Sequence, residues 1–151
     1  MRTPTLTITR GLPASGKTTW ARARQQSDPT LVLVCRDELR ATLHGGRYSP
    51  ANEEQVVAVR DAVVVDSLAR GRDVIVHDTN LNPAHVRALE ALARSLGASF
   101  AVEDFTGVPI EVCIARDALR GERVGEGVIR AMWDEYLRPA DPAGSEGGPA
   151  S

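Results

Sequence analysis

The sequence has little lysine, little cysteine and few aromatic residues, and it contains no long apolar run. Its longest unbroken apolar stretches, such as residues 31–35, have about five residues, whereas a membrane-spanning helix needs roughly 18. The N-terminus also lacks the apolar stretch of roughly 7–15 residues that a secretory signal requires. We therefore expect a protein that has neither a membrane span nor a signal peptide.

Only two cysteines are present, Cys35 and Cys113, and neither belongs to a CxxC or a Cys/His spacing. This pattern argues against a disulfide framework and against a zinc finger. Cys35 closes an apolar run and Cys113 lies in a helical pattern, so both are predicted to be buried free thiols. Free thiols favour a reducing, cytoplasmic setting.

The net charge and the length of the chain limit its class of function and its number of domains. The net charge of −2 and the pI of about 5.9 are not typical of a protein that coats nucleic acid non-specifically, although they permit a local basic groove. A length of 151 residues fits one domain. We expect that domain in residues 1–137 and a disordered tail, rich in Pro and Gly, in residues 138–151.

Short apolar runs alternate with segments of helical periodicity along the chain. Strands are predicted at residues 5–9, 31–35, 73–77 and 99–105. Helices are predicted at residues 16–25, 37–45, 50–70, 83–96, 109–120 and 127–137. This alternation predicts an α/β fold, with a short parallel sheet of about four strands and helices on both faces. Ligands of such sheets bind outside the carboxyl ends of the strands.

The segment after the first predicted strand has the pattern G-x-x-x-x-G-K-T and leads into a helix. Its glycines let the backbone wrap around phosphate oxygens, Lys17 reaches the β- and γ-phosphates and Thr18 ligates Mg²⁺. A chance match in a glycine-containing turn is the alternative, but the strand before and the helix after argue against it. The predicted ATP-binding residues here are Gly11, Ala14, Ser15, Gly16, Lys17, Thr18 and Thr19.

Lys17 is the only lysine among 18 basic residues, and all the others are arginine. Lysine is a compact point charge on a thin stem, whereas arginine carries a wide planar fork. We interpret Lys17 as marking a place inside the loop where a guanidinium would be too bulky.

Two candidate side chains follow the second predicted strand. Asp37 could take a proton from a nucleophilic hydroxyl, and Arg40, one helical turn later, could hold a phosphate or carboxylate of the acceptor. The alternative is that Asp37 caps the helix and Arg40 is a solvated side chain. The spacing alone leaves both interpretations open.

Further candidates follow the third strand and the fifth predicted helix. Asp78 follows an apolar strand as a Walker-B aspartate does, and it could act on the metal, organise the acceptor pocket or simply hold the loop. His77 is expected to pack rather than to catalyse. Arg116, Arg120 and Arg123 surround a glycine-containing link, where they could close on the triphosphate or form a solvated helix end.

The segments "RDELR", "DTNLNP" and "GVIRAMWDEYL" follow the phosphate loop in this order. Together they resemble the kinase domain of the bacteriophage polynucleotide 5′-kinase family, over residues 5–137. The resemblance implies a P-loop kinase fold with a helical lid. It also implies transfer of the ATP γ-phosphate, with Mg²⁺, to the 5′-hydroxyl of RNA or DNA. The family continues into a 3′-phosphatase domain with an acidic motif that this sequence lacks, so we expect no phosphatase activity.

The same resemblance implies roles for individual residues. Asp37 matches the general base, Arg40 the arginine that holds the acceptor phosphate, and Asp78 an essential aspartate of the acceptor side. Arg120 matches the lid arginine on the donor phosphates, with Arg116 as a second donor-side residue. A one-residue length difference leaves Arg116 and Arg123 as alternatives for the Arg120 position.

Three functional hypotheses follow. The first is a polynucleotide 5′-hydroxyl kinase that serves nucleic-acid repair. The second is a P-loop kinase of a small hydroxylated metabolite or drug, and the third is a non-catalytic ATP-binding module, which needs no base at Asp37. Arg40, which Arg36 and Arg47 could assist, supplies the cations that acceptor phosphates need and therefore favours the first hypothesis.

Overall fold

Four parallel strands form the centre of the computed structural model, which describes residues 2–121 and 123–140. They are β1 (Thr5–Arg10), β2 (Val32–Val34), β3 (Val74–Val76) and β4 (Ser99–Asp104), in the spatial order β2-β3-β1-β4. All three pairings are parallel, so the carboxyl ends of the strands meet at one edge of the sheet. The predicted parallel sheet is thereby confirmed. Residues 141–151 of the predicted tail lie outside the described residues.

The helices begin and end close to the predicted positions. They are α1 (Lys17–Ser27), α2 (Arg36–His44), α3 (Pro50–Ala69), α4 (Pro83–Ser95), α5 (Ile110–Ala118) and α6 (Glu126–Tyr136). Ser49 caps α3 by accepting the Asn52 N–H, and Pro50 occupies the first helical position, where its missing N–H costs no hydrogen bond. None of the helices in the described ranges has the length and apolar character that a membrane crossing needs.

One predicted cap is wrong. The N-cap of α2 is Cys35, and Asp37 lies inside the first helical turn. The reason is that Asp78 Oδ1 accepts the Arg36 N–H at 2.7 Å, which lets the helix begin directly after the extended Cys35. The Asp37 carboxylate is therefore free of a capping role.

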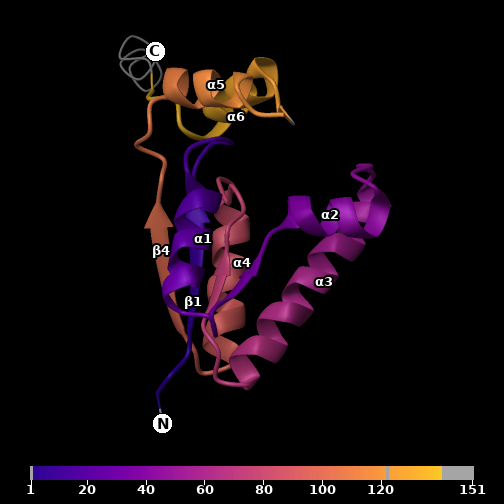
Figure 1. Cartoon of the computed structure of the whole chain (residues 1–151), viewed down its shortest axis with the longest axis vertical. Helices are drawn as coiled ribbons and strands as arrows, with labels where there is room; N and C mark the ends of the chain where they lie inside the picture. Colours follow the sequence, from indigo (N-terminus) through magenta and orange to yellow (C-terminus); the bar gives the residue numbers. More distant parts are fainter. Residues whose placement is uncertain (1, 122, 141–151) are drawn as a thin grey trace, which may run out of the picture.

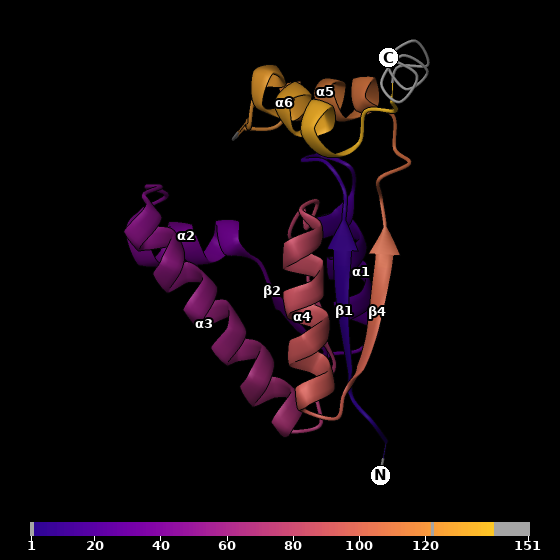
Figure 2. The same cartoon turned by 180° about the vertical axis from the view of Figure 1, so that it is seen from behind.

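Helices cover both faces of the sheet, as Figures 1 and 2 show. Because side chains alternate along a strand, β3 sends Val74 and Val76 into one core and Ile75 into another. The first core contains residues of α3 and α4, among them Val64 and Leu89. The second core contains Ala21 of α1. Two apolar layers thus fix the sheet and leave its carboxyl edge for polar side chains.

The last two helices, α5 and α6, lie across the carboxyl ends of the strands (Figure 1). A separate apolar cluster joins them to the loops below, with Leu12 and Leu81 packed against Cys113 and Ile129. All four side chains are buried. Burial of this kind contributes roughly 25 cal/mol per Å² of apolar surface, so the helix pair is docked above the sheet edge.

The buried Asp117 carboxylate ties the α5–α6 link to α5. It accepts the N–H groups of Val124 and Gly125 at 2.9 and 2.8 Å, and it pairs with Arg120 at 2.6 Å. Burial alone would raise the pKa of Asp117, but these hydrogen bonds and the Arg120 charge outweigh it and lower the pKa to about 2.

We expect Asp117→Asn to lower the free energy of unfolding by about 1–3 kcal/mol at neutral pH, because buried donors lose an ionised acceptor. The pKa of Asp117 is lower in the folded chain than its ordinary value of 3.8, so its contribution is present above about pH 4. The difference from wild type should therefore shrink as the pH falls from about 4 to about 2. Denaturant titrations across this range measure it.

The matched control is Asp134→Asn, since Asp134 pairs with Arg138 at an exposed position of α6. Its effect should stay within about 0.5 kcal/mol. A gap between wild type and Asp117→Asn that is the same at pH 2 and pH 7 would contradict this assignment.

Candidate active site

The loop between β1 and α1 has the backbone shape of an anion cradle. Gly16 has φ 107° and Ala14 has φ 64°, so two left-handed residues alternate with ordinary ones in the loop. Such a sequence of conformations turns successive N–H groups toward one concavity, and the strain at Ala14 is typical of functional sites. A Cβ on Gly11 would lie 2.7 Å from Phe105 Cβ and 2.6 Å from Ser15 Oγ. The close packing therefore requires glycine at position 11.

Lys17 lies folded onto this loop. Its side chain is 7% exposed, and Nζ donates to the Leu12 carbonyl at 2.6 Å and to Ser15 Oγ at 3.4 Å. Burial lowers the pKa of Lys17 to about 8. Among the described residues Lys17 has no carboxylate within ion-pair distance, so an incoming phosphate would be the first anion to contact it.

Asp78 is held from three sides directly after β3. Besides the Arg36 N–H on Oδ1, the Arg36 and Arg60 guanidinium groups lie 3.6 and 3.5 Å from Oδ2. These are ion-pair distances, and Oδ2 has no hydrogen-bond partner among the described residues. Asp78 lines the same cavity as Thr18, but its Oδ2 is buried between two guanidinium groups, so the contacts favour a role in holding α2 and α3 at the site over direct contact with Mg²⁺.

Asp37 and Arg40 lie together in α2. The Asp37 side chain is 85% exposed and accepts from Arg40 Nη1 at 2.8 Å. Arg40 also donates Nε and Nη2 to the two carboxylate oxygens of Glu53, at 2.9 and 2.7 Å. The hydrogen bonds with Glu53 raise the pKa of Arg40, and they lower the pKa of Glu53.

Sequence reasoning missed Glu53. It lies 13 positions after Arg40, in the next helix, where only the packing of α2 on α3 brings the two together. Arg40 is therefore oriented by a fixed fork, and an acceptor phosphate would have to compete with Asp37 for Nη1.

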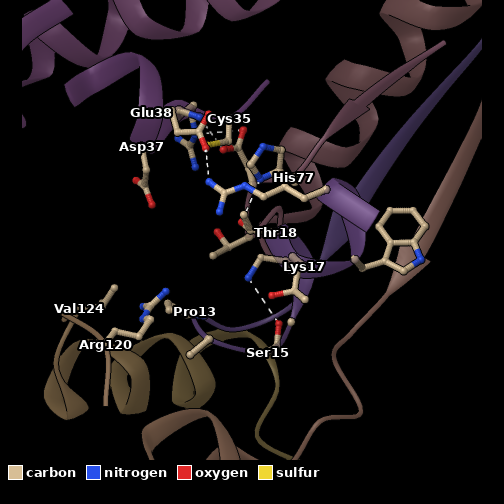
Figure 3. A pocket seen from close by; sticks show the side chains of 18 of the residues that line it. Pro13, Ser15, Lys17, Thr18, Cys35, Asp37, Glu38, His77, Arg120 and Val124 are labelled. Carbon is tan, nitrogen blue, oxygen red and sulfur yellow. Dashed lines mark hydrogen bonds and ion pairs between the residues drawn. The ribbon is translucent and has the colours of Figure 1, made fainter. Parts of the chain in front are cut away.

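One cavity of about 1170 Å³ joins these groups. Figure 3 shows Asp37, Lys17 and Arg120 around the same opening. Arg116 and Arg120 line it from the α5 side, whereas Arg123 does not. Of the predicted ATP- and acceptor-binding residues, Gly11 does not line the cavity and packs against Phe105 instead. The others all line it: Ala14, Ser15, Gly16, Lys17, Thr18, Thr19, Asp37, Arg40, Asp78, Arg116 and Arg120.

His77 packs as expected, but it also makes a polar contact that the sequence did not indicate. Its Nδ1 lies 3.0 Å from Thr18 Oγ1. Burial lowers the pKa of His77, so the neutral imidazole is favoured. The ring thus orients the hydroxyl that was predicted to ligate Mg²⁺.

A family model described as an AAA domain matches residues 6–142 of this chain. The chain is also similar to the L-seryl-tRNA(Sec) kinase of Methanococcus maripaludis, with 24% identity over 138 residues. That alignment covers 89% of this chain and 53% of the relative, so the chain spans about half the length of this curated relative.

Solved structures share the fold. A chain of the Pnkp1/Rnl/Hen1 RNA repair complex matches with a TM-score of 0.79 and 25% identity, over 89% of this chain and 44% of that one. A gluconokinase from Sinorhizobium meliloti 1021 matches with a TM-score of 0.61 and 17% identity, over 94% of this chain and 80% of that one. The second likeness concerns the fold alone, and together they confirm the predicted fold class.

We expect Lys17→Arg to lower phosphoryl transfer from ATP about 10²–10³-fold although the charge is kept. The ammonium sits between the Leu12 carbonyl and Ser15, and we expect the wider, planar guanidinium to displace these groups. Steady-state turnover with Mg·ATP measures the loss. Arg94→Lys, at an exposed position of α4, is the control and should behave as wild type. Near-normal turnover of Lys17→Arg would contradict the geometric argument.

Proposed function

The chain belongs to the AAA domain family of P-loop kinases, and from this premise we propose that it is a polynucleotide 5′-hydroxyl kinase. In this proposal it transfers the γ-phosphate of ATP to the 5′-hydroxyl end of RNA or DNA, with Mg²⁺.

The observation that carries the proposal is the position of Asp37. Its carboxylate is exposed at the cavity that the phosphate loop also lines. An alcohol that enters the cavity can therefore reach it, and a carboxylate there can accept the proton of the attacking hydroxyl. A module that only binds ATP has no use for this arrangement.

The acceptor side supports a nucleic acid. Arg36 and Arg40 line the cavity next to Asp37, and they can contact phosphates that flank the reactive hydroxyl. Tyr48 lines the same side, is 70% exposed, and lies under the Arg40 guanidinium with 5.9 Å to its ring centroid. An exposed aromatic ring offers a stacking surface to a terminal base. Similarity to a chain of an RNA repair complex and to a tRNA kinase agrees with such an acceptor.

Each residue of the site has one role in the proposed reaction. When bound, Mg·ATP supplies the phosphoryl group that is transferred. The loop amides and Lys17 would bind its phosphates, Thr18 would hold the metal, and Asp78 would keep α2 and the acceptor side in place. Asp37 accepts the hydroxyl proton, Arg40 orients the acceptor, and Arg120 with Arg116 balances negative charge on the donor side.

A second candidate is phosphorylation of a hydroxyl that is not a 5′ end. Similarity to a kinase of L-seryl-tRNA(Sec) supports an aminoacyl hydroxyl as the acceptor. The fold that the chain shares with a gluconokinase is compatible with a small metabolite as the acceptor. Both candidates use the same phosphate loop and Asp37. They differ in whether a phosphate next to the reactive hydroxyl is needed.

Transfer from γ-labelled ATP tests the proposal directly. We expect label on 5′-hydroxyl RNA or DNA oligonucleotides and none on the same oligonucleotides carrying a 5′-phosphate. Seryl-tRNA, nucleosides and sugars are tested in parallel. Labelling of one of these compounds, with no label on any oligonucleotide, would select the second candidate. No transfer to any acceptor would favour the non-catalytic module.

Asp37→Asn should lower kcat about 10²–10⁴-fold, because an amide cannot accept the proton. The fold should be unaffected, since the Asp37 side chain is exposed and does not cap α2. Glu54→Gln changes an exposed carboxylate of α3 outside the cavity and should keep wild-type kcat. A fully active Asp37→Asn would remove the general base from the mechanism.

The Arg40→Lys variant tests whether Arg40 contacts the acceptor rather than the donor. Lysine cannot keep both the Glu53 fork and a contact to the acceptor, so we expect the KM for oligonucleotide to rise at least about tenfold. The KM for ATP should change little, because Arg40 lies on the acceptor side. Arg70→Lys, at the exposed end of α3, should leave both values unchanged. If both KM values rose equally for Arg40→Lys, the assignment of Arg40 to the acceptor side would be wrong.

A further inference from the structure

Three side chains form a compact group at the side of the cavity; Cys35 and Glu38 have no part in the reaction proposed above, and His77 is linked to it only through its contact with Thr18. Cys35 caps α2, Glu38 lies in its first turn and His77 follows β3. One ligand atom of each lies within 4.8 Å of the others. Figure 3 shows the three side chains gathered near Thr18.

We propose that Cys35, Glu38 and His77 form a binding site for a divalent transition metal ion of the Zn²⁺ class. A thiolate, an imidazole and a carboxylate are the donors that Zn²⁺ takes, at about 2.0–2.3 Å. Three protein ligands and one water complete its tetrahedral coordination. Mg²⁺ requires oxygen ligands, so this site is chemically distinct from the magnesium position at Thr18.

The imidazole is already oriented for such a role. Its Nδ1 contacts Thr18 Oγ1, which leaves Nε2 as the nitrogen available to a metal. Metal-bound histidines commonly donate their second ring nitrogen to an oxygen acceptor, which fixes the ring and its tautomer. The His77 side chain is also buried, so surrounding atoms hold the ring in place.

The other two ligands give the ion an entrance. Glu38 is exposed, and its only ion pair among the described residues is an exposed one with Arg22 at 3.3 Å, which solvent weakens. Cys35 is buried but lines the cavity. Burial raises the pKa of the Cys35 thiol to about 12, partly offset by a hydrogen bond from the Glu38 backbone. Binding therefore releases the thiol proton to solvent as the sulfur–metal bond forms.

The site does not rest on the proposed function, and its test needs no substrate. The full chain, free of any tag and stripped with a chelator, is titrated with Zn²⁺ against a chromophoric chelator. Co²⁺ is then added as a spectroscopic probe. We expect one Zn²⁺ per chain, and a Co²⁺ spectrum with a thiolate-to-metal charge-transfer band.

Variants assign the ligands. Cys35→Ser should abolish the charge-transfer band and weaken Zn²⁺ binding at least about 10–100-fold. Glu38→Gln, at an exposed position where folding is not threatened, should weaken Zn²⁺ binding but keep the band. Cys113→Ser removes the other buried thiol and should leave both readouts unchanged. Thermal unfolding confirms that each variant is folded.

Two results would overturn the site. One is a wild-type chain that shows no thiolate band with Co²⁺ and no stoichiometric Zn²⁺ binding. The other is Zn²⁺ binding that Glu38→Gln and folded Cys35→Ser retain at full strength.

Discussion

The buried carboxylate of Asp78 is the interaction on which the arrangement at the sheet edge depends. It accepts the first N–H of α2 and faces the guanidinium of Arg60 in α3. The backbone carbonyl of Asp78 also accepts a hydrogen bond from the Thr9 hydroxyl of β1. A buried charge is tolerated only with such partners, so three elements are held to one relative position. Because α2 begins where Asp78 holds it, the next side chain, Asp37, projects from the first turn and is not used as a cap.

The cavity that results has two unlike sides. The side proposed to bind the donor is formed mainly by backbone, with a strained glycine-containing loop and a docked helix pair whose link is fixed by the buried Asp117. The side proposed to bind the acceptor is formed by side chains, where Glu53 holds Arg40 with two hydrogen bonds beside Asp37. A phosphate loop that faces charged side chains held in fixed positions suits the transfer of a phosphoryl group to a positioned hydroxyl.

Much of the fold and the phosphate loop could be predicted because the sequence signals for them are local. A cap residue followed by proline marked α3 and α4, and the phosphate loop was identified from eight consecutive positions. The contacts that orient the site were not predictable in this way. Glu53 with Arg40, Arg60 with Asp78 and His77 with Thr18 join segments 13, 18 and 59 positions apart, and no periodicity reports them. Which of the three arginines near the α5–α6 link reach the cavity was likewise not predictable; the fold brings Arg116 and Arg120, but not Arg123, to it.

The central claim is that a hydroxyl entering the cavity meets Asp37 while the phosphate loop holds the donor. A crystal structure with Mg²⁺, a non-hydrolysable ATP analogue and a short 5′-hydroxyl oligonucleotide tests it most directly. The account predicts the 5′-oxygen within about 2.6–3.2 Å of an Asp37 carboxylate oxygen, on the γ-phosphate side of the cavity. A 5′-oxygen that lies beyond hydrogen-bond reach of Asp37, with another carboxylate beside it, would contradict the account.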